Sequence, residues 1–122
     1  MANSTLKPVF YVLSISNDPS TAPIRNTVLA HAGYGVIPVR SIGAAIEVMT
    51  TRQVSIVVIG NSIPMHERMH ICREAMRLGI PSVVLDAHER AETSSAAHFN
   101  PLDGPEAFLE KVAALVKISQ PS

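Results

Sequence analysis

Short apolar runs recur along the chain and are separated by longer segments of mixed character. Runs rich in Val, Ile and aromatic residues predict β-strands, because these residues suit the pleated, buried surface of a sheet. Five such runs cover residues 9–15, 36–39, 54–59, 81–85 and 97–99. The third run is almost wholly apolar, which is typical of a strand buried on both faces of a parallel sheet.

The intervening segments carry apolar residues at helical spacing and are bounded by helix signals. The predicted helices cover residues 19–32, 42–50, 64–78 and 104–117. Gly33 and Gly79 follow two of them as C-terminal stops. Ser41 suits an N-cap, and Pro64 suits the first turn of the third helix.

Three of these helices have an apolar stripe that we expect to face the core. The stripes are Ile24, Val28, Leu29 and Ala32; Met65, Met69, Cys72 and Met76; and Phe108, Leu109, Val112, Leu115 and Val116. Cys72 is therefore predicted to be a buried packing residue. Ser14, in the first strand, is predicted to be a small residue tolerated by the core rather than a nucleophile.

The alternation of strands and helices predicts a doubly wound α/β domain with a five-stranded parallel sheet. Right-handed crossovers place helices on both faces of such a sheet. The stretch 86–100 has the weakest pattern, with a short helix over 89–95 before the fifth strand. We expect one domain over 9–118, between an N-terminal extension of residues 1–8 and a C-terminal tail of residues 119–122.

Composition and charge exclude several classes of protein. Hydrophobic residues make up 47% of the chain and charged residues 16%, which excludes a disordered chain. No apolar run approaches the roughly 20 residues that span a bilayer, and the N-terminus lacks the pattern of a secretion signal. Ten basic residues balance ten acidic ones, so no net charge attracts nucleic acid or a membrane. We therefore expect a cytoplasmic protein that recognises its partners by shape.

Polar residues follow the predicted strands at the edge where open α/β sheets carry their functional sites. The groups are Ser16-Asn17-Asp18-Pro19, Gly60-Asn61-Ser62-Ile63-Pro64, Asp86-Ala87 and Asn100-Pro101. With their prolines, these groups resemble the receiver (CheY-like) domain of bacterial response regulators. The stretch AHAGYGVIPVRSIGAAIEVM also resembles the receiver segment that runs from the first helix into the second. The resemblance implies a flavodoxin/CheY-like sheet with strand order 2-1-3-4-5.

Receivers use an aspartate after strand three as phospho-acceptor, an acidic pair after strand one for magnesium, a hydroxyl after strand four and a lysine after strand five. In this chain Gly60 stands at the phospho-acceptor position, and Ser16 and Asn17 stand at the positions of the acidic pair. Asp86 replaces the hydroxyl residue and Asn100 replaces the lysine. Only Asp18 keeps an acid of the cluster. The interval after the fourth strand is also shorter than in receivers, so the fourth helix, between strands four and five, is expected to be reduced.

Loss of the acceptor argues against phosphotransfer. We therefore predict a phosphorylation-independent, receiver-like module that binds protein in signal transduction or transcriptional regulation, with no enzymatic activity and no cofactor. Homodimerisation is an open alternative for the partner. A second hypothesis is a small-molecule or ion sensor whose pocket is lined by Asn17, Asp18, Asp86 and Asn100, with the two aspartates as cation ligands.

Residues 66–70, His-Glu-Arg-Met-His, match the H-E-x-x-H pattern of zinc hydrolases, in which two histidines bind zinc and the glutamate is general base. Glu89 lies at a spacing where one class of these enzymes has a third ligand. However, His66 and His70 align with two arginines, whose charges repel a divalent ion. We predict a solvated helix face, with a zinc hydrolase and adventitious metal binding as the alternatives.

Overall fold

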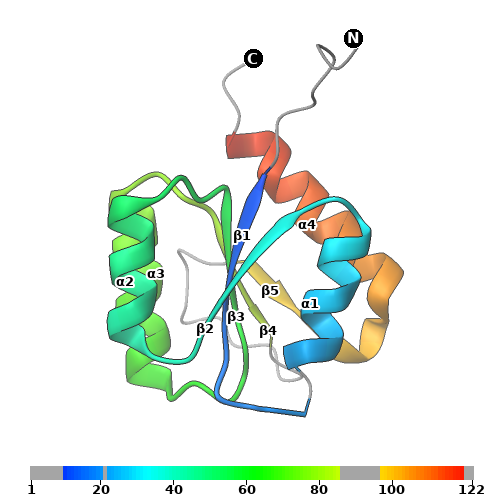
Figure 1. Ribbon diagram of the computed structural model, residues 1–122, viewed down its shortest axis with the longest axis horizontal. Coiled ribbons are helices and arrows are strands. Elements are labelled where there is room, and N and C mark those ends of the chain that lie inside the picture. Colours follow the sequence, from blue (N-terminus) through cyan, green and yellow to red (C-terminus); the bar gives the residue numbers. More distant parts are fainter. Residues whose placement is uncertain (1–9, 21, 86–96, 120–122) are drawn as a thin grey trace, which may run out of the picture.

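The computed structural model describes residues 10–20, 22–85 and 97–119. Its strands form one parallel sheet in the order β2-β1-β3-β4-β5 (Figure 1), which confirms the predicted fold class and strand order. The strands are β1 (Tyr11–Ile15), β2 (Gly35–Val39), β3 (Ile56–Ile59), β4 (Ser82–Leu85) and β5 (Ala97–Phe99). Each lies where the apolar runs predict a strand.

Among the described residues, two α-helices cover each face of the sheet (Figure 1). α1 (Ala22–His31) and α4 (Pro105–Ser119) lie on one face, and α2 (Ile42–Thr51) and α3 (Met65–Arg77) lie on the other. A short 3-10 helix, η2 (Pro101–Asp103), precedes α4. The predicted helix over 89–95, and with it the expected reduction of the fourth helix, lies outside the described residues. No helix in the described part of the chain is long and apolar enough to cross a bilayer.

The pleat of β1 divides the core between the two faces, because successive side chains of a strand point to opposite sides. Leu13 and Ile15 pack with α2 and α3, whereas Val12 packs with α1 and α4, and all three are fully buried. β3 is buried along its whole length, as its apolar sequence predicts. The sheet is therefore enclosed on both faces.

α4 docks through the stripe that the sequence predicts. The residues of this stripe, all buried or half-buried, are Phe108, Leu109, Val112, Leu115 and Val116. The rings of Phe99 and Phe108 lie 5.5 Å apart and are tilted by 51°. This is a favourable arrangement for an aromatic pair, and it joins the last helix to the edge strand β5.

The stripe predicted for α3 was wrong in part, since Cys72 is buried and Met65 is half-buried, but the other two methionines are exposed. Met69 is 42% exposed and Met76 is 61% exposed, while Ile71, Cys72 and Ala75 form the buried side. Periodicity alone cannot choose between the two stripes because the helix carries apolar residues on both. A 2.8 Å hydrogen bond from the Ile80 N–H to the carbonyl of the buried Ala75 closes the tight turn into β4.

The start of α3 also differs from the prediction. Pro64 is the N-cap of the helix and not a residue of its first turn, and its side chain makes no capping hydrogen bond.

The stripe predicted for α1 was wrong in part. Leu29 is buried, but Ile24 is 67% exposed and Ala32 is exposed beyond the end of the helix. Arg25 instead reaches the sheet, where its Nη2 donates to Ser14 Oγ at 3.3 Å. A pattern of apolar residues misses such a side chain, because arginine packs its methylene stem against apolar surface while its head finds a polar partner.

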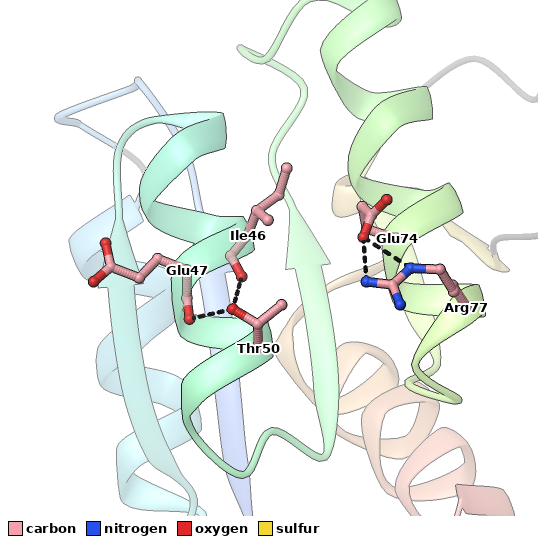
Figure 2. A network of polar contacts seen from close by, with 5 residues as sticks. All are labelled: Ile46, Glu47, Thr50, Glu74 and Arg77. Carbon is pink, nitrogen blue, oxygen red and sulfur yellow. Dashed lines mark hydrogen bonds and ion pairs between the residues drawn. The ribbon is translucent and has the colours of Figure 1, made fainter.

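The polar contacts drawn in Figure 2 stay within single helices. Thr50 Oγ1 donates to the carbonyls of Ile46 and Glu47 in α2, both at 3.0 Å. Arg77 donates to Glu74 Oε1 in α3 from Nη2 at 2.8 Å and Nε at 3.1 Å, and this hydrogen bond lowers the pKa of Glu74. Apolar packing, rather than these contacts, holds α2 and α3 on the sheet.

Candidate functional site

The loops after β1 and β3 meet at the carboxyl-terminal edge of the sheet. The Gly60 N–H donates to the Ile15 carbonyl at 2.9 Å, and the Ser16 N–H donates to the Val39 carbonyl at 3.2 Å. These backbone hydrogen bonds place Ser16 beside Gly60. The structure therefore brings together two of the positions that the sequence predicts to form one site.

The hydroxyl of Ser62 bridges the two loops, which sequence reasoning missed. Ser62 Oγ accepts the Asn17 N–H at 2.9 Å and lies 3.3 Å from Ser16 Oγ. Ser16 Oγ in turn accepts the Asp18 N–H at 3.0 Å. The only signal in the sequence was the place of Ser62, two residues after Gly60 in the same polar group. Hydroxyl groups thus connect the two loops at this edge of the sheet. In receivers, the same loops carry the cluster of carboxylates that this sequence lacks.

Gly60 is closely covered by Ser16. A Cβ atom built on Gly60 would lie 3.2 Å from both the Cβ and the Oγ of Ser16, which is tighter than an ordinary contact. Ser16 is buried, and its Oγ is held by Asp18 and Ser62, so its displacement would break these hydrogen bonds. The packing at position 60 is therefore fitted to glycine.

This packing predicts that Gly60→Val lowers the free energy of unfolding by about 2 kcal/mol, the usual cost of overpacking a closed site. The matched control is Gly43→Val, because a Cβ atom at Gly43 in α2 meets nothing within 4 Å. We expect the control to change stability by less than about 0.5 kcal/mol, since valine is the better helix former. Urea denaturation measures both. Equal values for the two variants would show that Ser16 yields without cost.

Asp18 caps its own loop. Its Oδ1 accepts the Ser20 N–H at 2.9 Å and the Ser20 hydroxyl at 2.6 Å, the arrangement of an Asx turn. Its carbonyl accepts the Ala22 N–H at 3.4 Å, at the start of α1. The one retained acid of the cluster therefore shapes the entry into α1.

Asn100 is used in a separate turn. Its Oδ1 accepts the Leu102 N–H at 2.9 Å and so caps η2. Within the described ranges, no hydrogen bond joins Asn100 to Ser16 or Gly60. Asp86 lies outside the described residues, so its predicted place in the pocket and its pairing with Asp18 around a cation stay predictions.

Neither a protein-family model nor a curated protein sequence matches this chain. Solved structures do match it. A response regulator receiver domain protein (CheY-like) from Methanospirillum hungatei JF-1 superimposes with a TM-score of 0.78 at 15% identity, over 92% of this chain and 97% of that one. The chain has the receiver fold.

Two further structures give the same result. A response regulator receiver protein from Sinorhizobium medicae WSM419 matches with a TM-score of 0.78 at 18% identity, over 92% of this chain and 98% of that chain. The receiver domain of sensor histidine kinase PA1611 from Pseudomonas aeruginosa PAO1 matches with a TM-score of 0.78 at 13% identity, over 90% and 99%. Identities this low establish the fold alone, so the chemistry of the site must be argued from its own residues.

Arg25 and Ser14 form a polar pair in an interior that is otherwise largely apolar. Ser14 is 2% exposed in β1 and is paired with Arg25, as a small core residue with a polar partner. Burial lowers the pKa of Arg25, and the nearby charge of Asp18 opposes this change. The available signal was the position of Arg25, one helical turn before the buried Leu29.

The H-E-x-x-H segment lies on the outer side of α3 in this receiver fold. His66 and His70 are both exposed, as predicted for a solvated face. Nowhere in the described ranges do three side chains of His, Cys, Asp or Glu gather as a metal site would require. Glu89, the third ligand considered from the sequence, lies outside those ranges.

Cys72, on the inner side of α3, is 3% exposed, which confirms its predicted role in packing. Burial raises the pKa of its thiol, and a hydrogen bond with Ser82 partly opposes that rise.

Proposed function

We propose that this chain is a phosphorylation-independent protein-interaction module of signal transduction or transcriptional regulation. The observation that carries the proposal is Gly60, which follows β3 of the receiver fold and whose side-chain space is closed by Ser16. Phosphoryl transfer to a receiver needs a carboxylate at this point. A magnesium ion needs further carboxylates, which Ser16 and Asn17 cannot supply.

The loop contacts support the same proposal. Ser62 holds the loops after β1 and β3 together through its own hydroxyl. A phosphorylation switch requires two arrangements whose balance the modification changes. These hydrogen bonds stabilise the arrangement of the two loops that the structure shows, which suits a surface presented constantly to a partner.

The outer side of α3 is the surface that we assign to the partner. Met69 and Met76 are exposed and stand seven residues apart, so they lie on the same side of the helix. Methionine adapts its shape to an apolar partner, and the exposed Arg73 beside this pair favours an acidic residue. The partner is a protein segment that combines apolar side chains with an acidic one.

A titration with magnesium and beryllium fluoride, a phosphoryl mimic, tests independence from phosphorylation. We expect the amide signals of Gly60 and Asn61 to show no saturable shift. The PA1611 receiver domain is the positive control, because its structure has magnesium coordinated in the active site cleft. Saturable shifts at Gly60 and Asn61 would mean that the pocket is active and would overturn the proposal.

Capture of partners from an extract of the native cells tests the binding role. We expect a specific protein to be retained equally with and without acetyl phosphate, and to be lost with Met76→Glu. Ile24→Glu is the matched control, because Ile24 is similarly exposed, at 67% against 61%, on the opposite face. Retention of the chain itself would identify a homodimer. Retention of nothing, or equal loss with both variants, would contradict the proposed surface.

A further inference from the structure

A cavity of about 420 Å³ is lined by residues of α1, β4, β5 and α4. Its volume lies in the range of roughly 300–1,000 Å³ that is usual for small-molecule sites. Most of its wall is apolar and is formed by Ile24, Val28, Leu85, Phe99, Pro105 and Phe108. Leu85 and Phe99 are the last residues of β4 and β5, so the cavity lies at the carboxyl-terminal edge of the sheet.

The inner wall of the cavity belongs to the packed core. Phe99 is 8% exposed and Phe108 is 5% exposed, and their rings contact each other. The wall is therefore formed before any ligand arrives. A water molecule inside a protein needs two to four polar partners, which apolar side chains do not offer. Replacement of poorly bound water by an apolar molecule is therefore favourable at this wall.

Two charged residues also line the cavity, and their charges are opposite. They are Asp18 and Arg25, and the charge of Asp18 acts on Arg25. An anion in the cavity would be repelled by Asp18, and a cation would be repelled by Arg25. Either ion would also lose its hydration against the apolar wall, which costs free energy. The lining therefore favours an uncharged ligand.

Asn61 adds an uncharged polar group to the lining. It is exposed in the loop after β3, and its side chain makes no hydrogen bond with another residue in the described part of the chain. A side-chain amide both donates and accepts hydrogen bonds, so it can pair with a hydroxyl group. Small-molecule sites typically combine apolar walls with a few polar groups that orient the ligand.

We infer that this cavity binds a small uncharged aromatic molecule that carries a hydroxyl group, with its ring against Val28 and Phe108 and its hydroxyl on Asn61. The lining contains neither Gly60 nor the exposed methionines of α3. The inference therefore does not rest on the proposed function, and each can fail without the other.

An NMR titration of the full chain with 2-naphthol tests this site. The charged probes with the same rings are 2-naphthoate and 2-naphthylmethylammonium. We expect saturable shifts at Val28, Asn61 and Phe108 with 2-naphthol, and about tenfold weaker binding of both charged probes, since each must lose its hydration. Binding of either charged probe as tight as that of 2-naphthol, or shifts without saturation, would overturn the inference.

An exposed variant tests the role of Asn61 without a threat to the fold. Asn61→Leu should lower the preference for 2-naphthol over naphthalene about fivefold, as the loss of one hydrogen bond implies. Gln53→Leu is the matched control, because it removes an exposed amide outside the cavity and should leave this preference unchanged. An unchanged preference in Asn61→Leu would contradict the site.

A second variant tests the apolar wall. Val28 is half-buried, and Val28→Phe places a larger side chain in the space that the ligand needs. We expect the affinities for 2-naphthol and naphthalene to fall together by about tenfold, while circular dichroism reports whether the fold is kept. Unchanged affinities in a folded Val28→Phe protein would show that the ligand binds elsewhere.

Discussion

Leu13→Ala lowers the free energy of unfolding by about 3 kcal/mol, because truncation of a buried leucine loses its transfer free energy and leaves a cavity. Leu13 is fully buried in β1, which lies between β2 and β3. Its side chain packs in the cluster that joins the sheet to α2 and α3. The rigid neighbours on three sides leave little room for the cavity to collapse. Urea denaturation followed by circular dichroism measures the change.

Leu102→Ala is the matched control, because it removes the same atoms from a residue that is 84% exposed in η2. We expect its stability to change by less than about 0.5 kcal/mol, as for other exposed positions without special contacts. Similar losses for Leu13→Ala and Leu102→Ala would mean that the core of this face is not where the structure places it.

Phe108→Ala lowers the free energy of unfolding by about 4 kcal/mol, in the usual range for a buried phenylalanine. Phe108 is 5% exposed, and its ring contacts that of Phe99 at the edge of the sheet. Loss of the ring also enlarges the cavity that Phe108 lines and exposes more of its apolar wall to water. Denaturation in urea again gives the change in stability.

Phe108→Leu separates the aromatic contact from simple burial. It keeps most of the apolar volume and should cost about 1 kcal/mol. In a double-mutant cycle with Phe99→Leu, the coupling between the two rings should be about 1 kcal/mol. A loss below 1 kcal/mol for Phe108→Ala would show that α4 does not depend on Phe108 for its attachment to the sheet.

The two predictions concern opposite faces of one sheet, and together they bear on function. The core packed on both faces of the sheet supports the described loops after β1 and β3, which hydrogen bonds join. Gly60 and Ser16 lie side by side because β1 and β3 are neighbouring strands. Backbone pairing alone is sufficient to place them there. This arrangement supports the binding role without phosphorylation that we propose.

For the candidate site, sequence reasoning could use only the identity of each residue, and its interpretation of position 60 stays a prediction. A glycine directly after β3 cannot accept a phosphoryl group in any arrangement of the chain. It failed for Ser62 and Arg25, whose roles depend on partners that lie 45 and 11 residues away along the chain. Neither residue belongs to a motif, and only the distances in the folded chain show what each one contacts.

The sequence by itself determined the alternation of strands and helices, the parallel sheet and the absence of a carboxylate at position 60. These features depend on short-range periodicity and on residue identity, which are written locally along the chain. Only the tertiary structure decided that α3 buries Ile71 and Ala75 instead of Met69 and Met76, and that α1 turns Arg25 toward β1. The physical reason is that each helix carries more than one stripe able to pack. The turns and neighbouring elements, not the helix's own period, select which stripe faces the sheet.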